Sequence, residues 1–181
     1  KDMTVTNCTF QGQYYYGMLF QYSDTVTVNY NTVRFASPGY SGQYGLLMQY
    51  CDGGIDLMDN DIVTGGTSQS YPAQITYCGS TSDTNNVVNN FFSSASPTAS
   101  SASGMYLAYS GPSRIFHNNF NCEFGGTLSN NGSGAWIYGT SSTHGPYWVM
   151  NNNFKSNRTN AAAGWIQATT GRLFSDNNNW D

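Results

Sequence analysis

The chain has 181 residues, a length that suits one domain with a substantial core. Only 9% of the residues are charged and the net charge is −4, so neither a nucleic-acid-binding surface nor a patch for anionic membranes is indicated. Aromatic residues make up 15%, which favours a folded chain over a disordered one. No apolar run approaches the roughly 20 residues of a membrane-spanning helix.

Short asparagine-rich segments recur along the chain, mostly with the apolar and polar alternation of a strand. Examples are "TVNYNTV", "NVVNNF" and "VMNNNF", and in chain order the segments end at Phe10, Val33, Ile62, Phe91, Phe120, Phe154 and Trp180. Two residues before the end, six of the seven segments carry asparagine: Asn31, Asn60, Asn89, Asn118, Asn152 and Asn178.

A second strand-like block follows each of the first six after a loop of variable length, as in "GMLFQYSD" and "GLLMQYCD". Both kinds of block share a period of about 28 residues, which leaves no room for a covering helix. Strands that recur in this way stack in parallel as a solenoid, about 4.8 Å apart. The alternation predicts that these pairs face inward: Met18 and Phe20, Leu46 and Met48, Ala73 and Ile75, Met105 and Leu107, and Ala135 and Ile137.

The asparagine column has a physical reason in such a solenoid. Asparagine tolerates the left-handed αL conformation of a sharp turn, and stacked asparagine side chains can hydrogen-bond along the axis. We therefore expect the six asparagines named above to form a structural ladder. The prediction is a single domain over residues 1–181, with about six rungs and a partial seventh.

The repeated blocks resemble those of the right-handed parallel β-helix proteins, the pectate-lyase-like superfamily. "VTVNYNTV" and "GMLFQYSD" match the rung pattern of that family, and the resemblance covers essentially the whole chain. It implies an all-β, right-handed, single-stranded parallel β-helix. It implies no single function, because such coils serve as lyases, hydrolases, tailspikes, adhesins and structural rods.

Two of the four cysteines fall in one column of the predicted coil. Ser23, Cys51, Cys78 and Ser110 occupy equivalent positions at the end of the second block, so Cys51 and Cys78 are expected on neighbouring rungs. The favoured interpretation is that the cysteines are small, mostly buried thiols, and the alternative is a disulfide between these two. No spacing typical of a metal site occurs, and no cofactor is predicted.

The few carboxylates concentrate in "CDGGIDLMDND", which holds Asp52, Asp56, Asp59 and Asp61, while Asp24 is expected one rung below Asp52. Asp24, Asp52 and Asp56 are the candidate catalytic residues of a polysaccharide lyase or glycoside hydrolase, because glycoside hydrolysis uses paired carboxylates. The same cluster offers oxygen ligands for calcium. The favoured alternative is a set of turn and surface residues, since the Asp-Asp pair and the Arg-Ile-Lys of polygalacturonase-like enzymes do not occur.

Aromatic residues outside the predicted core indicate a binding surface. Tyrosine and tryptophan provide large contact areas and still hydrogen-bond, which suits sugar rings and protein interfaces. The alternative is that loops pack their own aromatics against the coil. The candidates for glycan or partner binding, in predicted loops and late rungs, are Tyr14, Tyr15, Tyr16, Tyr40, Tyr44, Tyr71, Trp136, Tyr138, Tyr147 and Trp148.

The function that the sequence favours is an extracellular, cell-surface or virion-surface β-helix module rather than an enzyme. We expect it to bind polysaccharide or copies of itself through aromatic and asparagine-rich faces, as a segment of an adhesin, filament or tailspike does. Asn131 and Asn157 lie in Asn-x-Ser/Thr sequons in predicted loops and are candidate glycosylation sites. Since neither end carries a recognisable cap, the chain is expected to stack end to end or to continue into more coil.

Overall fold

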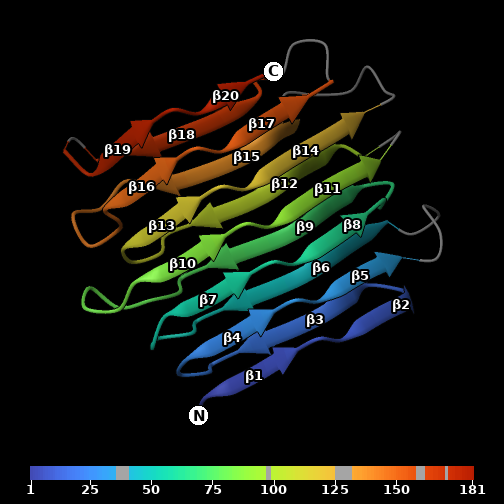
Figure 1. Ribbon diagram of the computed structural model, residues 1–181, viewed down its shortest axis with the longest axis horizontal. Helices are drawn as coiled ribbons and strands as arrows, with labels where there is room; N and C mark the ends of the chain where they lie inside the picture. Colours follow the sequence, from blue (N-terminus) through green and yellow to red (C-terminus); the bar gives the residue numbers. More distant parts are fainter. Residues whose placement is uncertain (36–40, 97–98, 125–131, 158–161, 170) are drawn as a thin grey trace.

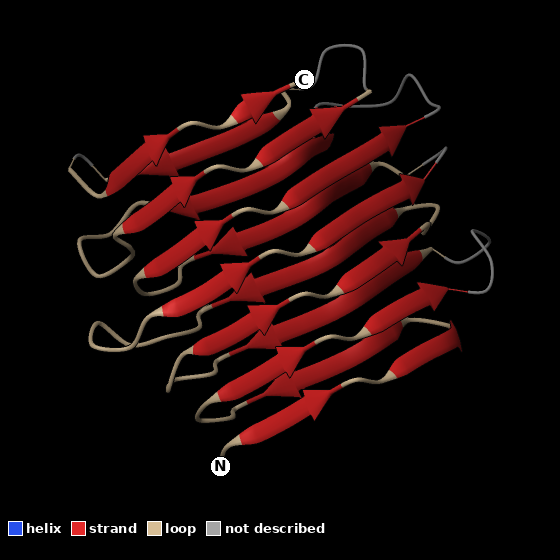
Figure 2. Cartoon of the chain, viewed as in Figure 1, coloured by secondary structure: helices blue, strands red, loops and turns tan. Residues whose placement is uncertain are grey.

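The structure, a computed structural model, describes residues 1–35, 41–96, 99–124, 132–157, 162–169 and 171–181. Within these residues the regular structure is entirely β-strand, arranged as three parallel sheets that wind as one coil (Figure 1 and Figure 2). This described part contains no helix of the length and apolarity needed to cross a membrane. The all-β parallel solenoid is therefore confirmed, and its right-handedness stays a prediction.

Successive strands of the chain pass in turn to three sheets, here named A, B and C. Sheet A contains, in spatial order, β1 (Met3–Thr6), β4 (Val26–Asn29), β7 (Ile55–Met58), β10 (Asn85–Val88), β13 (Ser113–Phe116), β16 (Tyr147–Met150) and β19 (Leu173–Asp176). Sheet B contains β2 (Thr9–Gln13), β5 (Thr32–Phe35), β8 (Asp61–Thr64), β11 (Phe91–Ser96), β14 (Asn119–Phe124), β17 (Asn153–Ser156) and β20 (Asn179–Trp180). Sheet C contains β3 (Tyr16–Gln21), β6 (Gly42–Gln49), β9 (Gln69–Thr76), β12 (Ser101–Ala108), β15 (Gly132–Gly139) and β18 (Gly164–Ala168).

The interior of the coil holds the residues that the alternation predicted to face inward. All five predicted pairs of the second block, which lie on sheet C, are buried. Sheet B adds a row of rings, in which the centroid of Phe120 lies 6.0 Å from that of Phe92 and 5.2 Å from that of Phe154. Burial of each such side chain contributes about 1.5–3 kcal/mol, so this continuous apolar column is the main stabilising feature of the fold.

An asparagine ladder joins consecutive rungs at the turn between sheets A and B. Asn31 donates both its backbone N–H and its Nδ2 to Asn60 Oδ1 at 3.1 Å. Asn60 repeats this pattern with Asn90 at 3.0 and 2.9 Å, and its Nδ2 also donates to the carbonyl of Val28 at 2.6 Å. The same contacts continue rung by rung through Asn31, Asn60, Asn90, Asn118, Asn152 and Asn178.

In one rung the ladder residue is Asn90 and not the predicted Asn89. Asn90 donates its Nδ2 to Asn118 Oδ1 at 3.0 Å, whereas Asn89 is exposed at the turn. The same shift moves the core position, because Phe92 is 0% exposed and Phe91 is 42% exposed. The prediction was one residue out of register here, since "NNVVNNFF" doubles both the asparagine and the phenylalanine.

The residue before each ladder position makes the turn, and the ladder asparagine itself does not. These preceding residues have φ between 50° and 59°, in the αL region, and they are Tyr30, Asp59, Asn89, His117, Asn151 and Asn177. In the first rung Asn7 has the same conformation before Cys8, whose backbone N–H donates to Asn31 Oδ1. This finding corrects the expectation that the ladder asparagines adopt αL. Their buried amides instead satisfy backbone groups that the turn removes from the sheets.

Candidate functional site

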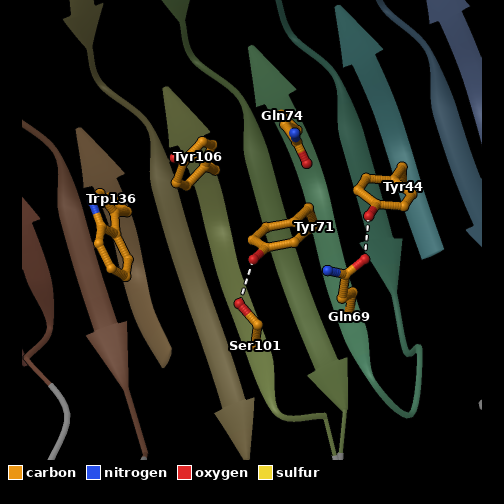
Figure 3. A pocket seen from close by; sticks show the side chains of 7 residues that line it. All are labelled: Tyr44, Gln69, Tyr71, Gln74, Ser101, Tyr106 and Trp136. Carbon is orange, nitrogen blue, oxygen red and sulfur yellow. Dashed lines mark hydrogen bonds between the residues drawn. The ribbon is translucent and has the colours of Figure 1, made fainter. Parts of the chain in front are cut away.

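An aromatic groove of about 340 Å³ opens on the outer face of sheet C (Figure 3). Strands β6, β9, β12 and β15 supply its side chains, so the groove runs across the strands along the axis of the coil. Its lining consists of Tyr44, Gln69, Tyr71, Gln74, Ser101, Tyr106 and Trp136.

The strand register places these side chains on successive rungs. Tyr44 is paired with Tyr71, and Gln74 is paired with Tyr106, which in turn is paired with Trp136. All five residues are partly exposed, while the residues that follow Gln74, Tyr106 and Trp136 are buried. The alternation that buries one face of the strand therefore presents the groove residues on the other.

The rings in the C-terminal part of the groove are tilted against one another. The ring centroids of Tyr71 and Tyr106 are 5.9 Å apart at an interplanar angle of 61°, and those of Tyr106 and Trp136 are 6.0 Å apart at 56°. Trp165 continues the row at 4.7 Å from Trp136 and at 63°. Tilted rings leave part of each π face uncovered, and these electron-rich faces attract polarised C–H groups of a ligand.

The polar groups of the groove are amides and hydroxyls. The hydroxyl of Tyr44 donates to Gln69 Oε1, and the hydroxyl of Tyr71 hydrogen-bonds with Ser101 Oγ (Figure 3). The phenols of Tyr44, Tyr71 and Tyr106 are neutral around pH 7, and burial raises their pKa further above the ordinary value of 10.0. The lining residues carry no formal charge, so the groove combines ring faces with neutral hydrogen-bonding groups.

A second aromatic column follows the ends of the sheet C strands. It is here called the tyrosine corner, and it is distinct from the β-sandwich motif of the same name. It consists of Tyr22, Tyr50, Tyr77 and Tyr109, all in the αL region with φ between 53° and 55°. Neighbouring rings are 5.0 to 5.2 Å apart at interplanar angles of 5° to 13°. Because this parallel stacking covers the ring faces, the tyrosine corner presents mainly ring edges and hydroxyls to solvent.

The aromatic residues predicted for binding are distributed over several faces of the coil. Tyr44 and Tyr71 lie in strands and not in loops, and together with Trp136 they line the groove. Tyr16 begins β3 and extends the row of rings, with its centroid 5.5 Å from that of Tyr44. Tyr138 packs edge-on against the tyrosine corner at 5.0 Å.

The other predicted aromatics lie away from the groove. Tyr14 and Tyr15 are exposed in the turn before β3, and Trp148 lies on the outer face of sheet A. Tyr147 contradicts the prediction, because it is 0% exposed in the core, where the first position of a sheet A strand faces inward. Tyr40 lies outside the described residues.

Sequence reasoning missed much of the groove and the whole tyrosine corner. The missed groove residues are Gln69, Gln74, Ser101 and Tyr106. The repeat contained a signal for Tyr106, which holds the same place in "GMYLAYSG" as Trp136 holds in "GAWIYGTS". The tyrosine corner could also have been predicted from the repeat. Each of its tyrosines directly precedes one residue of the small-residue column, which consists of Ser23, Cys51, Cys78 and Ser110.

The candidate catalytic carboxylates lie at different positions around the coil and do not form one cluster. Asp24 and Asp52 lie exposed in turns after sheet C strands on adjacent rungs, and Asp56 is on sheet A, where it accepts a 2.7 Å hydrogen bond from an asparagine of β10. Asp59 lies in the next turn, and Asp61 forms an ion pair with an arginine of β5. In the described residues no three Asp, Glu, His or Cys side chains gather as a metal site requires, so calcium gains no support.

A second and more open hollow, of about 440 Å³, lies over the turn between sheets A and B in the later rungs. Its lining is His117 together with Asn118, Asn119, Asn151, Asn152, Asn153, Asn177 and Asn179. These amides offer hydrogen bonds but no aromatic face.

Of the two candidate glycosylation sites, Asn157 is exposed just after β17 and Asn131 lies outside the described residues.

The family model for NosD, described as a periplasmic copper-binding protein, matches residues 1–180. The chain belongs to the NosD family. Searches of curated proteins and of solved structures find no match. Membership of the NosD family agrees with the parallel β-helix seen here.

The residues that the structure describes do not fit the copper in the family's name. Copper in proteins is held by Cys, His and Met ligands, and in this part of the chain no three His, Cys, Asp or Glu side chains gather. Met48 and Met105 are buried in the core. Met58 and Met150 share one row of sheet A, but two intervening strands separate them. We therefore assign no copper chemistry to these residues of the NosD-family chain.

Proposed function

We propose that this chain is a carbohydrate-binding module that works outside the cytoplasm and holds a neutral polysaccharide in the aromatic groove. The observation that carries the proposal is the row of tilted rings of Tyr71, Tyr106 and Trp136 beside neutral amides and hydroxyls. The periplasmic description of the NosD family supports a location outside the cytoplasm.

The chemistry of the lining favours neutral sugars over uronic acids. Amides such as those of Gln69 and Gln74 both donate and accept, which suits the hydroxyl groups of a sugar. The groove provides no cation to pair with a carboxylate. A polyuronate would therefore bring its charge to an aromatic surface with no partner, which costs free energy.

The length of the aromatic row favours a chain of sugars over a single sugar. From Tyr16 on β3 to Trp165 on β18, consecutive rings in the row lie 4.7 to 6.0 Å apart. This spacing follows the rung repeat, so a ligand with its own short repeat contacts several rungs at once. Several weak contacts on one chain then combine into a useful affinity.

Affinity electrophoresis of the full chain tests the proposal. Gels that contain a soluble neutral β-glucan or a galactomannan are expected to retard the protein, and gels that contain pectin are not. Trp136→Ala and Tyr106→Ala should each weaken binding by about tenfold, the equivalent of 1.4 kcal/mol. Trp148→Ala removes the same type of side chain from sheet A and should leave binding unchanged. Retardation by pectin alone, or an equal loss in Trp148→Ala, would contradict the proposal.

Contact between copies of the chain is a second candidate function, supported by the exposure of the tyrosine corner. Tyr22 is 78% exposed, and Tyr50 and Tyr77 are 42% and 46% exposed. Such edges suit a protein interface more than a sugar ring. Sedimentation velocity over a range of concentrations tests this candidate, with Tyr22→Ser as the variant that should dissociate a complex. A monomer at every concentration would rule out contact between copies as a function of the tyrosine corner.

A further inference from the structure

Cys51 and Cys78 lie opposite each other on adjacent rungs, at the turn that follows sheet C. The backbone N–H of Tyr50 donates to the carbonyl of Thr76 at 3.2 Å, and that of Gly79 donates to the carbonyl of Cys51 at 2.7 Å. These bonds flank the two cysteines and fix them in register. Adjacent strands are about 4.8 Å apart, which lies inside the roughly 4.4–6.8 Å between Cα atoms that a disulfide needs.

Both thiols lie inside the coil and are close enough to affect each other's protonation. Both cysteines are 0% exposed, and each thiol donates to a backbone carbonyl, Cys51 to that of Gln49 at 3.7 Å and Cys78 to that of Thr76 at 3.3 Å. The same column holds Ser23 on the rung below and Ser110 on the rung above. Cys51 and Cys78 are therefore the only cysteines of the described residues in this column.

The contact between the thiols affects their protonation in opposite directions. The neighbouring Cys78 thiol lowers the pKa of Cys51 to about 7. The same contact, together with burial, raises the pKa of Cys78. The pair therefore releases its first proton easily and its second with difficulty. A thiolate on Cys51 is the form that attacks a sulfur of a disulfide.

We propose that Cys51 and Cys78 form a disulfide when the chain folds in an oxidising compartment, and that this bond joins two rungs beneath the tyrosine corner. The Cys51 thiolate first attacks a sulfur of an oxidant disulfide, such as oxidised glutathione, and releases one thiol. Cys78 then loses its proton, and its sulfur attacks the Cys51 sulfur of the mixed disulfide and releases the second thiol. Two S–H bonds are lost, one S–S bond forms, and the oxidant takes up two electrons and two protons.

The position of the bond gives it a specific consequence. Each cysteine directly follows an αL tyrosine, Cys51 after Tyr50 and Cys78 after Tyr77. A bond between the two cysteines restricts both turns and closes one whole rung into a loop, which lowers the entropy of the unfolded chain. The inference depends on the proposed location outside the cytoplasm and is independent of sugar binding.

The other two cysteines are placed elsewhere. Cys8 is exposed at the turn between sheets A and B in the first rung. Cys122 lies in β14 in a separate small cluster with Ala99 and Ala102. Neither belongs to the column of Cys51 and Cys78, which makes Cys122→Ser a suitable control.

Peptide mapping of the full chain tests the inference. The reduced and denatured protein is refolded in a buffer of reduced and oxidised glutathione, alkylated, digested without reductant and analysed by mass spectrometry. The expected product is one linked pair of peptides that contain Cys51 and Cys78, lighter by two hydrogens than the free pair. Complete alkylation of both thiols, glutathione adducts alone, or a link that involves Cys8 or Cys122 would overturn the inference.

Thermal melting provides a second measurement. Wild type refolded with glutathione should melt about 5–10 °C higher than wild type refolded with a reductant. Cys51→Ser should fold, because serine occupies the equivalent position in two other rungs, and its two preparations should melt at the same temperature. Cys122→Ser should respond as wild type does. Identical melting of the two wild-type preparations would overturn the inference even if Cys51→Ser failed to fold.

Discussion

The side-chain oxygen of Asn118 accepts two hydrogen bonds from Asn90, one from the backbone N–H at 2.9 Å and one from Nδ2 at 3.0 Å. In the other direction, Asn118 Nδ2 donates to Asn152 Oδ1 at 3.0 Å and to the carbonyls of Val87 and Phe116. Asn118 is only 1% exposed, so one side chain satisfies several groups that water does not reach. Loss of this side-chain oxygen leaves the buried backbone N–H of Asn90 unsatisfied, which costs about 1–3 kcal/mol.

Asn118→Leu should therefore lower the free energy of unfolding by about 3 kcal/mol, measured by urea denaturation. Leucine fills similar space but supplies none of the hydrogen bonds. Asn89→Gly is the matched control, since Asn89 is exposed and in the αL region that glycine adopts freely. It should change the free energy by less than about 0.5 kcal/mol. Similar losses in both variants would contradict the corrected register of the ladder.

Gly104→Ala should destabilise the coil by several kcal/mol, on the order of other overpacked core sites. An added Cβ would lie 2.5 Å from the carbonyl oxygen of Gly134 and 3.0 Å from the backbone nitrogen of Asn121. Both neighbours are backbone atoms of adjacent strands, which cannot move aside as a flexible side chain does.

Gly42→Ala is the control for that substitution, because its nearest neighbours would lie at 3.5 Å, an ordinary van der Waals distance. We expect a change of less than about 1 kcal/mol in the free energy of unfolding. Equal stability of the two alanine variants in urea titrations would show that sheets B and C do not approach as closely as the structure has them.

The tyrosine corner predicts that asparagine is a better replacement for Tyr77 than valine. Either change removes ring contacts at 5.2 Å and 5.0 Å, worth about 0.5–1.5 kcal/mol each. Asparagine relieves the αL conformation, so Tyr77→Asn should cost less than about 1 kcal/mol. Valine is β-branched and tolerates αL poorly, so Tyr77→Val should cost about 3 kcal/mol. Urea denaturation measures both free energies of unfolding, and equal values for the two variants would contradict the role of the αL conformation.

Tyr147 predicts a loss of stability in alkali. Burial raises its pKa from 10.0 to about 12, so the folded state holds the phenol proton more tightly than the unfolded state. The resulting stabilisation is present in full below pH 10 and is lost as the pH rises from 10 to 12. A difference of two pKa units between the folded and unfolded states corresponds to about 3 kcal/mol in the free energy of unfolding.

Tyr147→Phe should remove this pH dependence while keeping the ring in the core. Below pH 10 the variant loses the 3.2 Å hydrogen bond to the carbonyl of Ser110, at a cost of about 1 kcal/mol. Near pH 12 it should be more stable than wild type, because it has no phenol to ionise. Chemical denaturation at pH 8 and pH 12 measures both differences, and parallel stability curves without a crossing would show that Tyr147 is not responsible.

The repeat made most of the fold predictable, because position in the period determines which side chains are buried. Leu46 and Leu107 were placed in the core by alternation alone, and both are 0% exposed. The shift at Asn90 was not predictable locally, since doubled residues fit two registers equally well. Only contacts with the neighbouring rungs distinguish them, because burying Phe92 also places Asn90 within reach of Asn118.

The candidate site was less predictable than the core. Alternation indicates that Tyr106 and Trp136 face outward, but the tilt between their rings depends on side-chain packing across strands. Tyr147 was assigned to the surface because it was grouped with the other aromatic residues of the late rungs, Trp136, Tyr138 and Trp148. Comparison with Val26 and Ile55, which begin the equivalent strands, would have placed it inside.

The asparagine ladder joins neighbouring rungs through the same hydrogen bonds, whatever the number of residues in each rung. Consecutive ladder asparagines are 29, 30, 28, 34 and 26 positions apart in the sequence, yet their Nδ2–Oδ1 distances all lie between 2.9 and 3.1 Å. Insertions and deletions between the strands therefore leave the alignment of the next rung intact. Natural variation, or a protein engineer, can exchange these connecting segments for others of different length and chemistry, and the coil can display a new surface without a new core.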